Sequence, residues 1–103
     1  MTLEERFRAD LLRTYVDAAK RGYHATYFMQ MLETYGGVEM AKRLLDDDQV
    51  QSGLYRLAEL GLLRLSVENL VLNPVYDELF LSSVKNAARK RLEDLGFEPG
   101  GWD

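Results

Sequence analysis

The side chains that could do chemistry are one histidine, three consecutive aspartates and three adjacent acidic pairs. His24 stands between Tyr23 and Ala25, without the nearby nucleophile and orienting carboxylate that a catalytic histidine needs, so we expect it to be structural. The acidic pairs occupy solvent-facing positions of expected helices, away from the burial that suits a carboxyl group to acid catalysis: Glu4 and Glu5, Asp77 and Glu78, Glu93 and Asp94. We therefore predict that the protein is not an enzyme.

The aspartate run Asp46, Asp47 and Asp48 raises the question of a cation site. Successive helical residues point about 100° apart. The run also lacks the alternating ligands, central glycine and distal glutamate of an EF-hand loop. The chain has no cysteine, which excludes disulfides, thiolate zinc sites and iron–sulfur ligation, and its glycines fit no phosphate-binding loop. We predict no metal and no cofactor.

Chain length and net charge exclude further classes of function. A chain of 103 residues forms one small domain and has no room for an enzyme with a cleft between two domains. The net charge of −4 has the wrong sign for a protein whose main task is to bind phosphate backbones. No apolar run reaches the roughly 20 residues of a membrane span, and the N-terminus is acidic where a secretion signal is basic. We expect a cytoplasmic protein that does not bind membranes.

A cluster of aromatic residues and methionines between residues 23 and 35 is the best candidate for a binding surface. Helical spacing sends Phe28, Met31 and Tyr35 inward and leaves Tyr27 and Met29 exposed. Tyrosine and methionine are adaptable contact residues, although ordinary core packing with scattered surface residues is the alternative interpretation.

The resulting hypothesis is a site for a protein partner. Tyr27, Met29 and Trp102 would supply apolar anchors, and Arg89 and Lys90 would supply charge at the rim. The basic cluster that contains Arg89 and Lys90, together with Lys85 and Arg91, is otherwise expected on a solvated helix face. A homo-oligomer is also possible, since small helical domains often complete their cores across a two-fold axis.

The elements that must position these residues are short helices, separated by closely spaced turn signals. A capping box from Thr2 to Glu5 begins the first helix, and Gly22 ends it. Further helices are expected over residues 25–35, 38–45 and 49–60, the last capped by Asp47 or Asp48. A short piece begins at Pro74, and Ser82 or Ser83 caps a final helix that stops at Gly96. This predicts an all-α bundle of about five to seven short helices over residues 1–96, with residues 97–103 as a flexible tail.

Residues 63–72 have two interpretations. Leu63, Leu65 and Val67 alternate with polar residues, as in a hairpin strand, but the turn would lack the glycine that tight hairpins favour. Ser66 is a good N-cap for a helix over residues 67–72, which we favour.

A hairpin over residues 63–72 would instead complete a winged-helix-like fold, with nucleic acid as the partner of the helix over 49–60. Residues 57–63 look like the exit of a recognition helix in winged-helix regulators. The side chains offered to DNA would be Gln51, Ser52, Tyr55 and Arg56. A single arginine close to the aspartate run gives poor phosphate affinity, so DNA binding is the alternative to protein binding.

Residues 23–96 resemble a small bacterial helical domain of uncharacterised function that occurs alone and alongside restriction or defence-type nucleases. The matching strings are Tyr27-Phe28-Met29-Gln30-Met31, Gly36-Gly37-Val38-Glu39, Ala41-Lys42-Arg43-Leu44-Leu45, Ser52-Gly53-Leu54, Leu65-Ser66-Val67-Glu68, Leu79-Phe80 and Ala88-Arg89-Lys90-Arg91-Leu92. The resemblance implies an all-helical accessory domain in a nucleic-acid-processing context. It implies no catalytic residue.

Overall fold

The computed structural model describes residues 1–47 and 52–102, which fold as an all-α bundle. The α-helices are α1 (Leu3–Lys20), α2 (Phe28–Tyr35), α3 (Gly37–Asp46), α4 (Ser52–Glu59), α5 (Val67–Val71) and α6 (Ser82–Asp94). Two short 3-10 helices, η1 (Leu63–Leu65) and η2 (Pro74–Leu79), flank α5. The predicted all-α class is confirmed.

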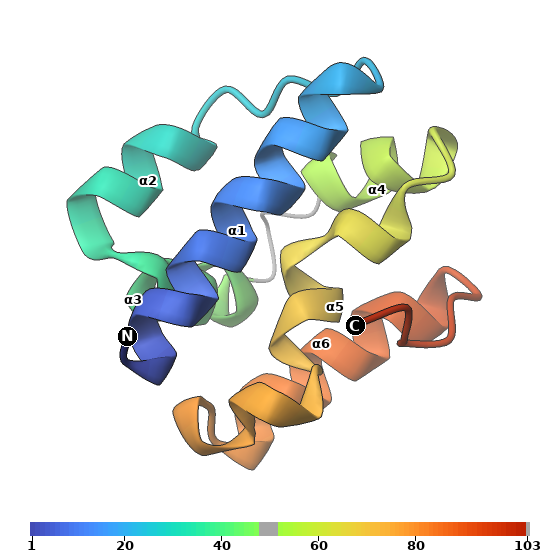
Figure 1. The fold of residues 1–103 in the computed structure, drawn as a ribbon. Coiled ribbons are helices and arrows are strands. Elements are labelled where there is room, and N and C mark those ends of the chain that lie inside the picture. Colours follow the sequence, from blue (N-terminus) through green and yellow to red (C-terminus); the bar gives the residue numbers. More distant parts are fainter. Residues whose placement is uncertain (48–51, 103) are drawn as a thin grey trace.

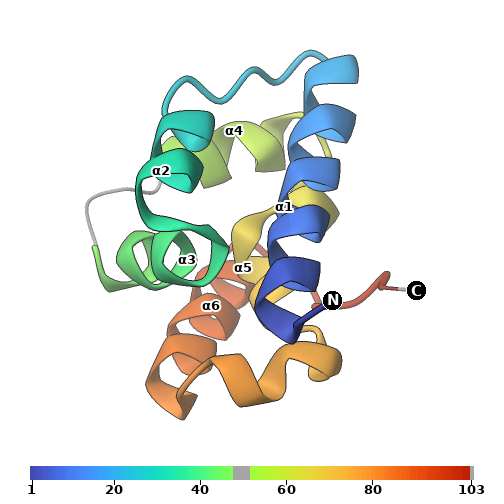
Figure 2. The same ribbon diagram turned by 60° about the vertical axis from the view of Figure 1, so that its left-hand side comes forward.

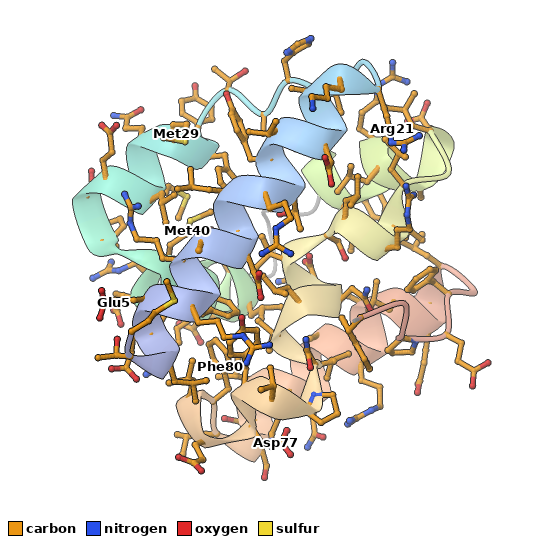
Figure 3. The ribbon with its side chains drawn as sticks, viewed as in Figure 1. Glu5, Arg21, Met29, Met40, Asp77 and Phe80 are labelled. Carbon is orange, nitrogen blue, oxygen red and sulfur yellow. The ribbon has the colours of Figure 1, made fainter. Side chains whose placement is uncertain are left out.

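In the view of Figure 1, helix α1 lies between α2 and α3 on one side and α5 and α6 on the other, and the turned view of Figure 2 places it at one edge of the bundle. The core lies where α1 meets α3, η2 and α5, and where α3 and α5 meet α6. Phe7 of α1 packs edge-on against Tyr76 and Phe80, with ring centroids 5.0 and 5.1 Å away. Met40 lies in the interior, while Glu5, Arg21 and Asp77 lie at the periphery (Figure 3).

The helix starts predicted at Thr2 and Ser66 are confirmed. The backbone N–H of Glu5 donates to Thr2 Oγ1 at 3.1 Å, and the N–H of Thr2 donates to Glu5 Oε1 at 3.0 Å. The N–H of Asn69 donates to Ser66 Oγ at 3.1 Å and caps α5. Because this cap starts a helix, residues 63–72 form η1 and α5, and the hairpin of the winged-helix alternative is wrong.

Other boundaries differ from the expectation. Helix α2 begins at Phe28, because residues 23–25 lie outside helix and residues 26 and 27 form a turn. Helix α6 begins at Ser82 without a side-chain cap. Asp47 closes α3 in an extended conformation, whereas Asp48 and the expected start of the 49–60 helix lie outside the described residues.

Two adjacent glycines join α2 to α3. Gly36 has a φ of 79° and a ψ of 173°, a combination that only glycine adopts easily. Gly37 lies against α1, where a Cβ atom would come within 3.2 Å of the Arg8 Cα. The predicted break at these residues therefore provides both a sharp turn and a close helix–helix contact.

Candidate functional site

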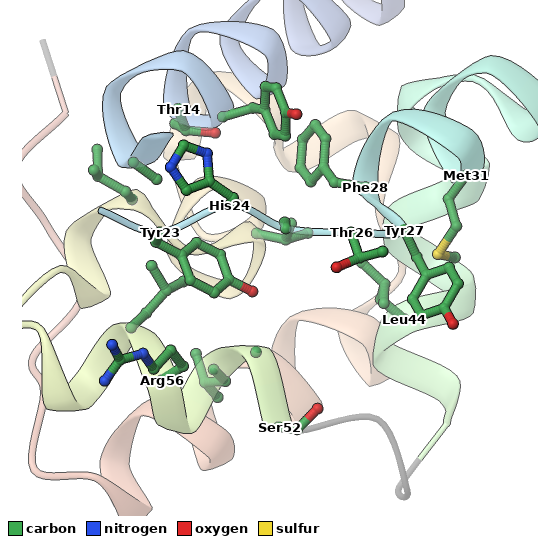
Figure 4. Close-up of a pocket in the computed structure, with 18 of the residues that line it drawn as sticks. Thr14, Tyr23, His24, Thr26, Tyr27, Phe28, Met31, Leu44, Ser52 and Arg56 are labelled. Atoms are coloured by element: carbon green, nitrogen blue, oxygen red, sulfur yellow. The ribbon is translucent and has the colours of Figure 1, made fainter. Parts of the chain in front are cut away.

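A pocket of about 420 Å³ opens between the end of α1, the loop over residues 21–27, α3 and α4 (Figure 4). Its lining is largely apolar. Ala18, Met40, Leu54 and Leu57 contribute buried side chains from α1, α3 and α4. Aromatic rings from α1, the loop and the start of α2 complete it: Tyr15, Tyr23, Tyr27 and Phe28. Volume and lining are typical of a site for a small apolar group.

The aromatic wall is built by the turn that follows α1. Gly22, at a φ of 98°, reverses the chain, and the N–H of Tyr23 then donates to the Ala18 carbonyl at 2.9 Å. The ring of Tyr15 stacks on that of Phe28, with centroids 5.0 Å apart. These contacts attach both ends of the loop to α1, through the Tyr23 backbone at one end and the Phe28 ring at the other.

Tyr23 reaches across to α4, as Figure 4 shows. A Cβ atom at Gly53 would lie only 2.6 Å from the Tyr23 hydroxyl oxygen, so a glycine at this position leaves room for the ring. Burial raises the pKa of Tyr23, and the neighbouring carboxylate of Glu68 raises it further. The hydroxyl therefore stays protonated at neutral pH and can donate or accept a hydrogen bond.

The charged side chains that line the pocket are already paired. Glu68 accepts from Arg91, with 3.2 Å between Oε2 and Nη1. Arg56 lies 3.5 Å from the Glu59 carboxylate. What remains for a ligand is an apolar wall with the His24 imidazole and the hydroxyl groups of Tyr23, Thr26 and Ser52 around it (Figure 4). This arrangement suits an uncharged group better than an ion.

The predicted anchors are distributed unequally about this pocket. Tyr27 is 71% exposed and lies at the rim, as the hypothesis requires. Met29 packs against the core and is only partly exposed. Tyr35, which we expected to point inward, is 41% exposed. The Arg43 guanidinium lies over its ring, with 4.1 Å between Arg43 Cζ and the Tyr35 ring centroid.

The two cations predicted at the rim of the site, Arg89 and Lys90, do not lie at the pocket. Arg89 and Lys90 are exposed on α6, where Arg89 donates to Asn86 and Lys90 pairs with Asp94 at 3.4 Å. Helices α2 and α6 are well separated in both views of the fold (Figures 1 and 2). These cations therefore do not share a surface with Tyr27.

The chain's C-terminal segment also departs from the expectation. We expected a flexible tail over residues 97–103, but through Trp102 the structure holds this segment against the bundle. The indole N–H of Trp102 donates to the Asn69 carbonyl at 2.9 Å, and its ring packs on the core. Trp102 is thus engaged within its own chain and is not a free anchor.

Residues proposed for DNA contact lie on α4, apart from Gln51, which is outside the described residues. Ser52 and Arg56 line the pocket, and Tyr55 is half exposed. Arg56 pairs with Glu59, which reduces the charge available to a phosphate. With α5 in place of the hairpin, the structure lacks the wing over residues 63–72 that this alternative requires.

Sequence reasoning missed the buried role of Arg91. Its guanidinium pairs with Glu68 and also donates to the Leu44 carbonyl at 3.0 Å and the Asp47 carbonyl at 2.8 Å. We expected Arg91 in a solvated basic cluster. The available signal was its helical spacing from Ala88, Leu92 and Leu95, which places an arginine on the apolar side of α6.

Within residues 1–47 and 52–102, no three histidine, aspartate or glutamate side chains gather closely enough to hold a metal ion. The same part of the chain contains no helix with the length and apolar character of a membrane span. Comparisons with protein-family models, with curated proteins and with solved structures find no match.

Proposed function

We propose that this chain is a non-enzymatic protein-interaction module that binds an uncharged, apolar side chain of a partner protein in the pocket at Tyr27. The observation that carries the proposal is the pocket itself: aromatic rings line it, and Tyr27 stands 71% exposed at its rim. Tyrosines beside a preformed pocket are typical of the residues that dominate binding energy in protein interfaces.

The pairing of its charged groups supports a neutral occupant. A carboxylate or ammonium group entering the apolar part of the pocket would lose its hydration, and the buried Glu68 is already paired with Arg91. Arg56 pairs with Glu59 only at the exposed surface, outside the apolar wall. The same pairing, with a single histidine and no cysteine in the sequence, supports a role in binding and not in catalysis.

The resemblance noted above supplies the cellular setting of the proposal. It supports an accessory domain in the bacterial cytoplasm, in a DNA-processing or phage-defence context. In that setting the partner is another protein, and the pocket receives one of its leucine or aromatic side chains.

The affinity expected for a single side chain decides which experiment can detect its binding. Burying one leucine or phenylalanine side chain is worth about 1.5–3 kcal/mol, so an isolated residue should bind weakly, with a Kd of about 5–80 mM. We therefore test the pocket by ¹H–¹⁵N NMR titration with N-acetyl-leucine amide and N-acetyl-phenylalanine amide, and use N-acetyl-glutamine amide as the polar control. The proposal expects saturable shifts in the loop and α4 for the two apolar probes only.

Substitutions in and beside the pocket test whether the apolar probes bind there. Tyr27→Ala should weaken the apolar probes several-fold, and Ala25→Leu should fill part of the pocket and do the same. Tyr35→Ala is the matched control, because it removes another exposed tyrosine of the same region that does not line the pocket. Equal shifts with the glutamine probe, or no saturation by either apolar probe, would overturn the proposal.

A further inference from the structure

Asn69 binds the C-terminal segment of the chain through both ends of its side-chain amide. Asn69 Oδ1 accepts from the N–H of Gly100 at 3.0 Å, and Asn69 Nδ2 donates to the Gly100 carbonyl at 2.9 Å. The backbone carbonyl of Asn69 accepts from the Trp102 indole at 2.9 Å. One residue of α5 thus recognises both backbone groups of one tail residue and the side chain of another.

The Asn69 amide is oriented by contacts that do not involve the tail. Its Nδ2 also donates to the Arg64 carbonyl at 3.1 Å, so the nitrogen side of the amide points toward η1 and the oxygen remains for an incoming N–H. The Asn69 backbone is held by the Ser66 cap. Asn69 is 1% exposed with the tail in place. Removing the tail would leave oriented polar atoms without a partner, which is costly unless something else satisfies them.

The tail lies beside an open hollow at the surface. A hollow of about 490 Å³ is lined by Gly101 and Trp102 together with α1 residues, Arg64, Leu70 and Asn73. Gly100 and Gly101, with φ angles of 155° and 83°, give the segment a backbone conformation that other residues rarely adopt. A Cβ atom at either glycine would meet nothing within 4 Å, so the site has open space around this segment.

These features are those of a peptide in a binding site: bidentate backbone recognition, an anchoring indole and adjacent open volume. We propose that the Asn69 surface is a peptide-binding site, that residues 98–102 are its resident ligand, and that the Gly-Gly-Trp segment of a second copy of this chain can take their place. This proposal is independent of the pocket at Tyr27. It predicts exchange between copies, in which the attached tail is favoured at low protein concentration by its high effective concentration.

The test uses the full chain with Trp102→Ala, which removes the only tryptophan and empties the indole position. A synthetic peptide of residues 98–103 then carries the sole tryptophan, so its fluorescence anisotropy and emission maximum report binding. We expect a saturable rise in anisotropy and a blue shift of the emission. No binding at millimolar peptide would overturn the proposal.

Two modified peptides separate this recognition from general hydrophobic attachment. N-methylation of the Gly100 nitrogen removes the hydrogen that donates to Asn69 Oδ1, and should weaken binding about five- to tenfold, since such a bond contributes about 1–1.5 kcal/mol. Replacing Trp102 of the peptide by 1-naphthylalanine, which is fluorescent but has no indole N–H, should weaken it similarly. Equal affinity for all three peptides would show that the peptide attaches only by non-specific hydrophobic contact, and would contradict the proposal.

A second measurement covers the case in which Trp102→Ala does not fold. In the wild-type chain, the Gly100 amide and the Trp102 indole hydrogen should exchange slowly with solvent, because both are hydrogen-bonded to Asn69. An excess of the peptide should accelerate both exchange rates by displacing the attached tail. Slow exchange that added peptide leaves unchanged would refute a replaceable ligand.

Discussion

The guanidinium of Arg91 and the carboxylate of Glu68 form an ion pair whose side chains are 7% and 9% exposed. Arg91 lies on α6 and Glu68 on α5, and the same guanidinium donates to the carbonyls of Leu44 and Asp47 at the end of α3. Three helices are therefore joined through one side chain. Because the carbonyl end of a helix carries partial negative charge, the arginine also complements the dipole of α3.

Replacing Arg91 by methionine should be strongly destabilising. It leaves the buried Glu68 carboxylate without its cation, and the expected loss is about 3–5 kcal/mol in the free energy of unfolding. The double variant Arg91→Met/Glu68→Leu should lose less than Arg91→Met alone, because it buries no unpaired charge. Urea unfolding followed by circular dichroism measures both, and equal losses in the two variants would contradict the role given to the pair.

Lys90→Met is the matched control for that experiment. Lys90 lies next to Arg91 but pairs with Asp94 on the exposed face, where both side chains are mostly in solvent. Exposed pairs contribute about 0–1 kcal/mol, so urea unfolding should show little change.

Ser66→Ala should destabilise the chain by about 1 kcal/mol, because it removes the acceptor for the Asn69 N–H and so the cap of α5. Thr2→Ala removes the cap of α1 at the exposed N-terminus, where water can replace the lost acceptor. We expect the Ser66 variant to lose more stability in thermal unfolding. A larger loss at Thr2 would show that burial does not increase the value of the Ser66 cap.

Gly36→Ala should cost about 1–3 kcal/mol, since an alanine is strained at a φ of 79° and a ψ of 173°. Nothing lies within 4 Å of the Cβ position, so any loss comes from the backbone and not from a clash. Thr34→Ala, on the exposed face of α2, is the control. Chemical unfolding of the two variants distinguishes them, and wild-type stability for Gly36→Ala would rule out a required glycine conformation.

Tyr76 should make the chain sensitive to alkaline pH. Burial raises the pKa of its hydroxyl, and the hydrogen bond that it donates to Asp10 raises the pKa further, well above the ordinary value of 10.0. The unfolded chain therefore loses this proton at lower pH than the folded chain. The stability gained is complete below pH 10 and is lost as pH rises beyond it.

The comparison variant is Tyr76→Phe, which is destabilised at neutral pH because Asp10 loses a donor but should lose less additional stability between pH 9 and 11. Tyr23, whose pKa is also raised, titrates in both proteins, so the difference isolates Tyr76. Urea unfolding at pH 7, 9 and 11 measures the free energy of unfolding of both proteins. Parallel stability curves for the two proteins would be inconsistent with a raised Tyr76 pKa.

Features that depend on neighbours in the sequence were predictable. The caps at Thr2 and Ser66, the breaks at Gly22 and at Gly36 and Gly37, and the all-α class follow from local hydrogen bonds, backbone conformations and apolar spacing, which a short segment determines by itself. The same local logic correctly favoured a helix over a hairpin after Ser66. Helical spacing identified Tyr27 as exposed, but the same spacing placed Tyr35 inward, whereas the structure leaves Tyr35 41% exposed.

Long-range contacts were not predictable in this way. Glu68 and Arg91 are 23 positions apart, and Asn69 and Gly100 are 31 apart, so no periodicity relates the partners. Sequence alone therefore determined the all-α class, the caps at Thr2 and Ser66 and the glycine breaks, but not η1 or the start of α2. Only the tertiary structure decided that a basic residue is buried, that the tail is held by an asparagine and that aromatic rings enclose a pocket, because those outcomes depend on which surfaces lose water when the helices pack together.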